Sequence, residues 1–339
     1  MIWIRVCHVI MAVLLYNTGV GAEKDSDETK PFSLSEPTSH IGCCDASAGV
    51  AVSSNLFLMA NDEDNLLRVY RRDRSGPPVQ AFQAGPFLRV DPKKPESDIE
   101  GAARVGDRIY WITSHGRNRS GEARESRHRF FATIFRVNDK GVVELKVVGV
   151  PYTRLLSDLI KDARLAKFNL LHASTLAPKE EGGLNIEGMC GTANGEMLIG
   201  FRNPIPDKQA LIVPLKNPSE LVEGKPAKFG DPILLDLEDR GVRDMTRVGE
   251  RILIIGGPSD GKGNFHLYEW DGRAPVPHKI PATHFRGINP EALVIYPDAP
   301  PNEFQILSDD GTRKVAGLDC KLVPDSSRRA FRSFWAHLD

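Results

Sequence analysis

The sequence lacks several features that would narrow its function at once. It has no apolar segment of about 20 residues, no CxxC pair or Cys/His cluster, and no HExxH or GxGxxG motif. These absences argue against a membrane-spanning helix, a structural zinc site, a zinc protease and a dinucleotide-binding loop. The charges nearly balance, with 44 Lys and Arg against 45 Asp and Glu in 339 residues. We therefore expect no nucleic-acid partner and no broad affinity for anionic membranes.

The first 22 residues have the pattern of a secretory signal peptide. An early cation, Arg5, precedes an apolar run from Val9 to Leu15, and the segment ends in the small residues Val20-Gly21-Ala22. The apolar run is too short to span a bilayer. We expect residues 1–22 to be removed and the mature protein to be secreted or periplasmic.

Cysteines are few, and their spacing fits export. Of five cysteines, Cys7 leaves with the signal peptide, and the other four allow three complete pairings: Cys43, Cys44, Cys190 and Cys320. If the two ends of the folded part meet, Cys320 forms a disulfide with Cys43 or Cys44. Cys190 lies inside an inner strand and is expected to stay free and buried.

Five segments of the chain share one pattern: a polar start, a small residue, a short apolar strand, a polar turn and a second apolar strand. Their equivalent positions are separated by 53, 87, 56 and 48 residues and are occupied by Ser47, Glu100, Glu187, Arg243 and Glu291. Self-similarity over tens of residues is typical of repeat architectures. Each step except the second suits one four-stranded blade. The sequence therefore predicts an all-β fold, a β-propeller with five four-stranded blades in the simplest case and six as the alternative.

The domain boundaries follow from these repeats. The polar residues 23–40 are expected to form a disordered linker, and residues 41–339 the propeller. The long second step contains Tyr152 to Leu171, where leucines recur at helical spacing, so we expect one inserted helix that emerges at the channel mouth as a lid. The terminal strand from Phe331 to Ala336 is expected to be the fourth strand of the last blade.

Motifs of a known family occur in order along the chain: Trp111-Ile-Thr-Ser-His-Gly-Arg-Asn, Asn185-Ile-Glu-Gly, Gly241-Val-Arg-Asp and Pro290-Glu-Ala-Leu-Val. Over essentially the whole mature chain the sequence resembles the bacterial family called domain of unknown function 3616. The resemblance implies a propeller-like fold in exported proteins and carries no established activity. The recurring Glu-Gly start is also similar to that of the phytase-like esterase propellers.

Propeller topology predicts where chemistry would lie. The first strand of each blade lines the channel, and its entry lies at the same end as the exit of the second strand. This end is expected to collect a ring of ligand-binding residues, Glu100, Glu187, Arg243 and Glu291, with His115, Arg117, Arg202, Asn203, Asp309 and Asp310 beside it. Carboxylates at short range raise each other's pKa, so Arg243 or a divalent cation such as calcium would neutralise them. The alternative is a structural ring that only bonds neighbouring blades.

Two loops bear on anion binding. Residues 114–129 contain five arginines and form either a solvated loop or an anion clamp, because guanidinium groups match phosphate or carboxylate. Arg117 is expected to lie nearest the mouth. The segment Gly256 to Gly263 resembles a phosphate-binding loop, but it ends in Gly and joins two strands, so we expect a hairpin turn.

These features predict an exported propeller with a polar ligand or ion site at the mouth of its central channel. The alternative is a metal-assisted phosphoester or glycoside hydrolase that uses the channel carboxylates. No catalytic residue and no metal ligand can be assigned from the sequence, so it leaves open whether the protein is an enzyme. We expect a monomer whose partner is a small anionic molecule or a glycan.

Overall fold

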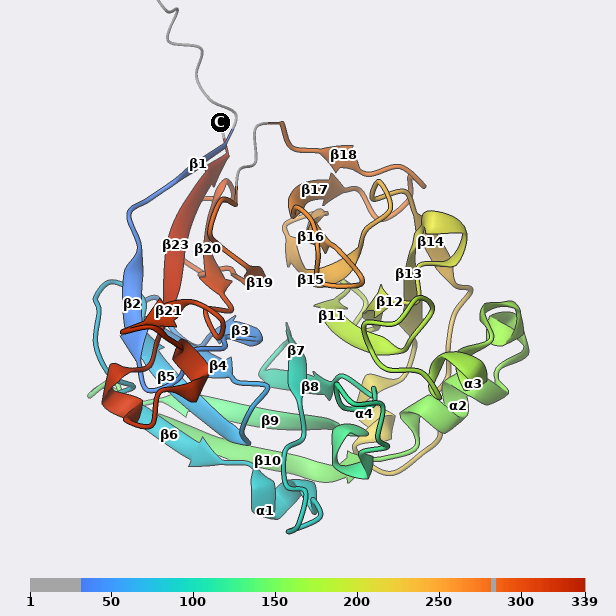
Figure 1. The fold of residues 1–339 in the computed structure, drawn as a ribbon, viewed down its shortest axis with the longest axis horizontal. Coiled ribbons are helices and arrows are strands. Elements are labelled where there is room, and N and C mark those ends of the chain that lie inside the picture. Colours follow the sequence, from blue (N-terminus) through green and yellow to red (C-terminus); the bar gives the residue numbers. More distant parts are fainter. Residues whose placement is uncertain (1–31, 282–284, 339) are drawn as a thin grey trace, which may run out of the picture.

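A computed structural model describes residues 32–281 and 285–338. Five antiparallel sheets surround one axis as the blades of a propeller (Figure 1), so five blades, and not six, are confirmed. The first three blades, from the axis outward, consist of β3 (Ala48–Ala51), β4 (Leu56–Ala60), β5 (Leu66–Arg71) and β6 (Gln80–Gln83); β7 (Ile99–Val105), β8 (Arg108–Thr113), β9 (Phe130–Val137) and β10 (Val143–Tyr152); and β11 (Asn185–Gly191), β12 (Met197–Asn203), β13 (Ala210–Leu215) and β14 (Ile233–Leu235).

The fourth blade has the same order, and the fifth is assembled from both parts of the chain. The strands of these two blades are β15 (Gly241–Val248), β16 (Arg251–Gly257), β17 (His266–Trp270) and β18 (His278–Lys279); and β19 (Pro290–Val294), β20 (Glu303–Ser308) and β23 (Ala330–Leu338), flanked by β1 (Phe32–Leu34) and β2 (Thr38–Ile41). Alternating β-branched and aromatic residues in these segments favour strands.

The first strands of the described chain close the ring. β1 and β2 both pair antiparallel with β23, with Phe32 opposite Leu338 and Thr38 opposite Ser333. The strand at the C-terminal end is therefore the third strand of its blade, not the fourth. The expected disordered linker over 23–40 is also wrong for β1 and for residues 38–40. Pairing satisfies the free edge of β23.

Buried side chains hold these closing strands in place. Phe32 packs edge-on against Phe285, and the buried His40 stacks on Phe331. These few side chains give a largely polar segment enough burial to become ordered. Residues 1–22, expected to be a signal peptide, and residues 23–31 of the expected linker lie outside the described residues.

The insertion in the second step is helical, as predicted. It contains α2 (Leu155–Lys161), a 3-10 turn (Ala163–Phe168) and α3 (Leu170–Ala173). Leu155 and Leu159 of α2 are buried in the core between the second and third blades. The helices thus cover the outer flank (Figure 1), and the expected lid over the mouth is not found in the described part of the chain.

The other helices and turns are short. They are α1 (Gly85–Leu88), α4 (Pro218–Leu221), four 3-10 turns (Glu125–Arg127, Pro206–Lys208, Cys320–Leu322 and Ser326–Arg328) and the small hairpin of β21 (Lys314–Val315) with β22 (Leu318–Asp319). None of the described helices has the length and apolar character needed to cross a membrane.

A disulfide joins the two ends of the propeller. Cys44, just before β3, is bonded to Cys320, and their Cα atoms are 5.9 Å apart across 276 residues of sequence. Cys43 and Cys190 are free and buried. The predicted approach of Cys320 to the vicinal pair and the buried free state of Cys190 are therefore confirmed.

Replacing Cys320 by Ser is expected to lower the free energy of unfolding by about 2–4 kcal/mol, because the crosslink restricts the unfolded chain over a long loop. Denaturant titration of the oxidised wild type and the variant measures the difference. A reducing agent should lower wild-type stability by a similar amount and leave Cys320→Ser unchanged. Equal stability of the two oxidised proteins would contradict this role for the disulfide.

Candidate functional site

The repeat-equivalent residues share one backbone feature. Pairing of β7 with β8 shifts register between Ile99 and Gly101, so Glu100 has no partner across the ladder. The same β-bulge occurs in the three following innermost strands at Glu187, Arg243 and Glu291. A bulge re-aims a side chain relative to the regular pleat, and all four side chains line one cavity at the channel mouth.

This cavity, of about 1090 Å³, is strongly polar. Six of the predicted ligand-binding residues line it: Glu100, Glu187, Arg202, Arg243, Glu291 and Asp309. Asn61 and Asp62, which the exit of the second strand also places at this end, line it as well. Sequence reasoning missed a further set of lining residues, chiefly Asp45, Asp98, Arg119, Lys179 and Asn185.

The centre of the mouth is a buried ion network. Glu187 accepts hydrogen bonds from Asn185 Nδ2 at 2.7 Å and from Arg202 Nη1 at 2.9 Å. Arg243 Nε lies 3.0 Å from Glu187 Oε2, and Arg243 Nη2 donates to Glu291. The two guanidinium groups therefore neutralise the two glutamates, which is the structural role considered from the sequence.

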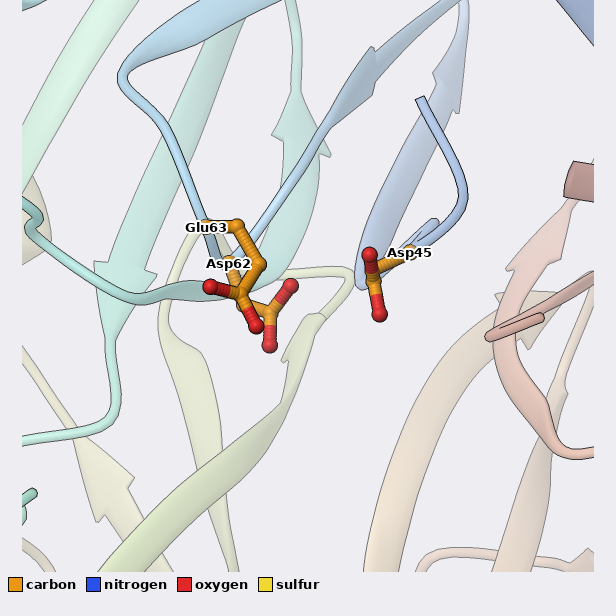
Figure 2. Close-up of side chains that lie close together, drawn as sticks. All are labelled: Asp45, Asp62 and Glu63. Atoms are coloured by element: carbon orange, nitrogen blue, oxygen red, sulfur yellow. The ribbon is translucent and has the colours of Figure 1, made fainter. Parts of the chain in front are cut away.

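The acidic side of the mouth, formed by the first two blades, has no such balance. Carboxylate oxygens of Asp62, Asp98 and Glu100 lie within 4.8 Å of one another, as do those of Asp45, Asp62 and Glu63. Figure 2 shows Asp62 and Glu63 side by side after β4, with Asp45 facing them from the segment before β3. Asp62 belongs to both groups, and its buried Oδ1 has no hydrogen-bond partner in the described chain.

Burial and mutual repulsion disfavour the charged forms of these acids. Desolvation, followed by the charges of Asp62 and Asp309, raises the pKa of Asp45 to about 9. Desolvation also raises the pKa of Asp98 to about 7, although Arg127 opposes it from 2.8 Å. The pKa values of Asp62 and Glu100 are raised well above the ordinary range for the same reason. Lys321, which lies 2.7 Å from Glu63, opposes the shifts of Asp45 and Asp62 without cancelling them, so the acidic side remains short of positive charge.

The basic side of the mouth is formed by the third blade, the segment before it and the β8–β9 loop of the second blade. Arg202 at the end of β12 is buried, and Lys179 and Arg119 extend from exposed loops to line the same cavity. Desolvation and then the charge of Arg202 lower the pKa of Lys179. Opposite charges are therefore separated across one cavity.

The other predicted site residues serve the scaffold. His115 is buried, bonds Thr113 O through Nδ1 at 2.7 Å and stacks on His128. Arg117 donates to Ser174 O and Gly121 O, each at 2.9 Å, so Arg119 rather than Arg117 lines the cavity.

Asn203 and Asp310 are also turned away from the cavity. Asn203 Nδ2 holds the segment before β11 by donating to Pro178 O and Glu180 O. Asp310 accepts two hydrogen bonds from Arg332, at 2.7 and 2.6 Å. Each of these polar groups is used locally because burial requires a partner.

A sequence signal for most of the missed residues does exist. Asp45, Asp98 and Asn185 each stand two residues before the repeat-equivalent position. The repeat that identified Glu100 and Glu187 therefore also marks this second ring, whose members lie at or just before the start of each innermost strand. The strand topology places Asp62 at the mouth, at the exit of a second strand, although its acidic turn resembles an ordinary turn. Only tertiary packing brings its carboxylate to within 4.8 Å of those of Asp98 and Glu100.

Residues 141–292 match the family model described as "Protein of unknown function (DUF3616)". Over this stretch the chain is similar to the DUF3616 family. No curated protein matches the chain.

Several solved structures align with almost the whole length of the chain. The PQQ-bound aldose sugar dehydrogenase of Streptomyces coelicolor is 10% identical, with a TM-score of 0.46 over 91% of this chain and 98% of its own. A putative oxidoreductase (glucose dehydrogenase) of Thermus thermophilus is 11% identical, with a TM-score of 0.42 over 89% and 100%. A streptogramin B lyase is 7% identical, with a TM-score of 0.36 over 91% and 98%.

Glu187→Gln is expected to lower the free energy of unfolding by about 3 kcal/mol, because two buried guanidinium groups lose their shared counter-charge. The matched change Glu100→Gln should leave stability unchanged or raise it in the absence of divalent cations, since Glu100 is repelled by its neighbours. Denaturant titration in EDTA measures both. An equal loss in the two variants would refute the division into a neutralised centre and an unbalanced acidic side.

Metal-free protein is expected to lose stability as the pH rises from about 7 to 8.5. The native Asp45 keeps its proton up to about pH 9, whereas the unfolded chain loses that proton near pH 4. The native state therefore binds more protons than the unfolded state in this window, and the free energy of unfolding falls with pH. Calorimetric Tm values in EDTA test this, and Asp45→Asn should flatten the slope. A wild-type Tm that is constant or rises with pH would contradict the raised pKa.

Proposed function

We propose that the channel mouth of this propeller binds a divalent cation, calcium being the first candidate, and through it a polar ligand. The observation that carries the proposal is Asp62. Its carboxylate is shared by two groups of acids whose oxygens lie within 4.8 Å, and its buried Oδ1 has no partner among the described residues. A buried carboxylate oxygen without a donor is costly unless a cation coordinates it.

The chemistry of the donor set supports a hard cation. Calcium takes six to eight oxygen ligands, mainly from carboxylates, carbonyls and water. Asp62, Asp98 and Glu100 supply carboxylate oxygens, and the nearby cavity wall adds the Oδ1 atom of Asn185, which is buried and unpaired. The cation would replace the missing positive charge on this side.

The proposed position differs from the ring expected from the sequence. Glu187 and Glu291 already pair with Arg202 and Arg243, so they have little need of a cation. Arg127 balances Asp98 and Glu96 only in part. The cation is therefore proposed at the first two blades, beside Asp62, and not on the channel axis.

We further propose that the protein works outside the cytoplasm as a monomer and takes a small anionic molecule or a glycan. Support for export comes from the signal-like residues 1–22 and from the disulfide, since disulfides persist in oxidising compartments. Hydrolysis of a phosphoester or glycoside would need the same cation, which lowers the pKa of a coordinated water. Ligand binding and hydrolysis would therefore both depend on the bound cation.

Wild-type protein freed of metal with EDTA and then dialysed is expected to bind calcium in a calorimetric titration. Asp62→Asn should weaken this binding at least tenfold, because it removes the carboxylate common to both groups of acids. Glu250→Gln removes an acid that is almost fully exposed and far from the mouth in the fourth blade, so it should bind like the wild type. Absence of calcium binding to the wild type, or equal binding by Asp62→Asn, would overturn the proposal.

A further inference from the structure

The basic side of the mouth contains positive charge that the protein itself does not use. Among the described residues, neither Lys179 nor Arg119 has a carboxylate within ion-pair distance, although the chain has many acids. Both side chains line the cavity. By contrast, Lys321 on the acidic side of the same cavity pairs with Glu63 at 2.7 Å, and Lys216 on the outer surface pairs with Glu196 at 2.8 Å.

The Arg202 guanidinium group lines the same cavity and has one nitrogen, Nη2, without a hydrogen bond to the described chain. Its Nη1 donates to Glu187 at 2.9 Å and its Nε to Pro258 O at 3.2 Å, which fixes the guanidinium group in a buried position. A guanidinium group offers five N–H donors, and these two bonds leave Nη2 available. The arginine is therefore pre-positioned and needs no rearrangement to meet a ligand.

Gly261 shows how closely the cationic groups converge. A Cβ atom built on this residue would lie 3.2 Å from both Arg202 Nη2 and Lys179 Nζ. The two nitrogens are therefore within about twice that distance of each other, over a glycine whose backbone has φ +80°. This glycine belongs to the 256–263 segment that resembles a phosphate-binding loop in sequence, and the absence of a side chain leaves room for both cations.

The convergence carries an electrostatic cost. Desolvation, followed by the charges of Arg202, Arg119 and Arg243, lowers the pKa of Lys179, and the charge of Glu187 opposes this shift. Arg202 has Glu187 as its counter-ion, whereas Lys179 and Arg119 have no carboxylate within ion-pair distance among the described residues. Like charges that lack a counter-ion destabilise one another. A small anion placed above Gly261 would remove this cost and accept hydrogen bonds from two of the groups at once.

We infer that Lys179, Arg202 and Arg119 form an anion subsite that binds the phosphate group of a small phosphorylated ligand. A phosphate dianion offers an oxygen to each of three donors, whereas a carboxylate offers two oxygens and a single charge. The subsite itself requires no cation. Only the placement of the rest of the ligand towards Asp62, across the same cavity, rests on the proposed function.

The test is a calorimetric titration with inorganic phosphate in EDTA, which examines the anion subsite while the cation site is empty. We expect the wild type to bind phosphate and to bind acetate at least tenfold more weakly. Lys179→Gln and Arg119→Gln should each weaken phosphate binding about tenfold, the effect of losing one charge-assisted hydrogen bond. Both side chains are exposed at the rim, so the fold should tolerate either change.

Lys146→Gln is the matched control, because Lys146 is an exposed lysine on the outer strand β10 and should leave phosphate affinity unchanged. Absence of phosphate binding, or an equal effect of Lys179→Gln and Lys146→Gln, would overturn the inference. Acetate binding as tight as phosphate binding would also overturn it, by assigning the subsite to carboxylates. Failure of calcium binding with phosphate binding intact would reject the proposed function alone.

Discussion

The five innermost strands meet around one axis, where there is room for little more than backbone. A Cβ atom on Gly101 would come within 2.8 Å of Glu187 O, and one on Gly188 would collide with Val242. Small residues therefore follow the bulges at Glu100, Glu187 and Glu291, while the bulges direct the long side chains to the mouth. Crowding at the axis thus both packs the blades and gathers charged groups at one end.

Charge is separated across this mouth, although the chain as a whole is nearly neutral. The first two blades contribute Asp62, Asp98 and Glu100, and the basic side contributes Arg202 and Lys179. Glu187 and Arg243 between them neutralise the centre. A ligand that spans the cavity would therefore meet a negatively charged surface at one end and a positively charged surface at the other.

Closure of the ring also positions the acidic side. Cys44 is bonded to Cys320, and its carbonyl oxygen accepts a hydrogen bond from Asp310 N at 2.9 Å. Asp45 is the next residue, so its carboxylate is held against Asp62 by the same contacts that join the first blade to the last. Stability of the closed propeller and the geometry of the proposed cation site are consequently linked through one short segment.

The sequence by itself determined the five-bladed propeller, the resemblance to DUF3616, the inserted helix and the repeat-equivalent positions that line the mouth, because repeats express local strand patterns directly. It could not show that Arg117 and Asp310 bond to the scaffold while Arg119 reaches the cavity, or that β1 and β2 complete the last blade. Those outcomes depend on which partner each polar group and strand edge finds. Such partners come from distant parts of the chain, and only tertiary packing brings them together.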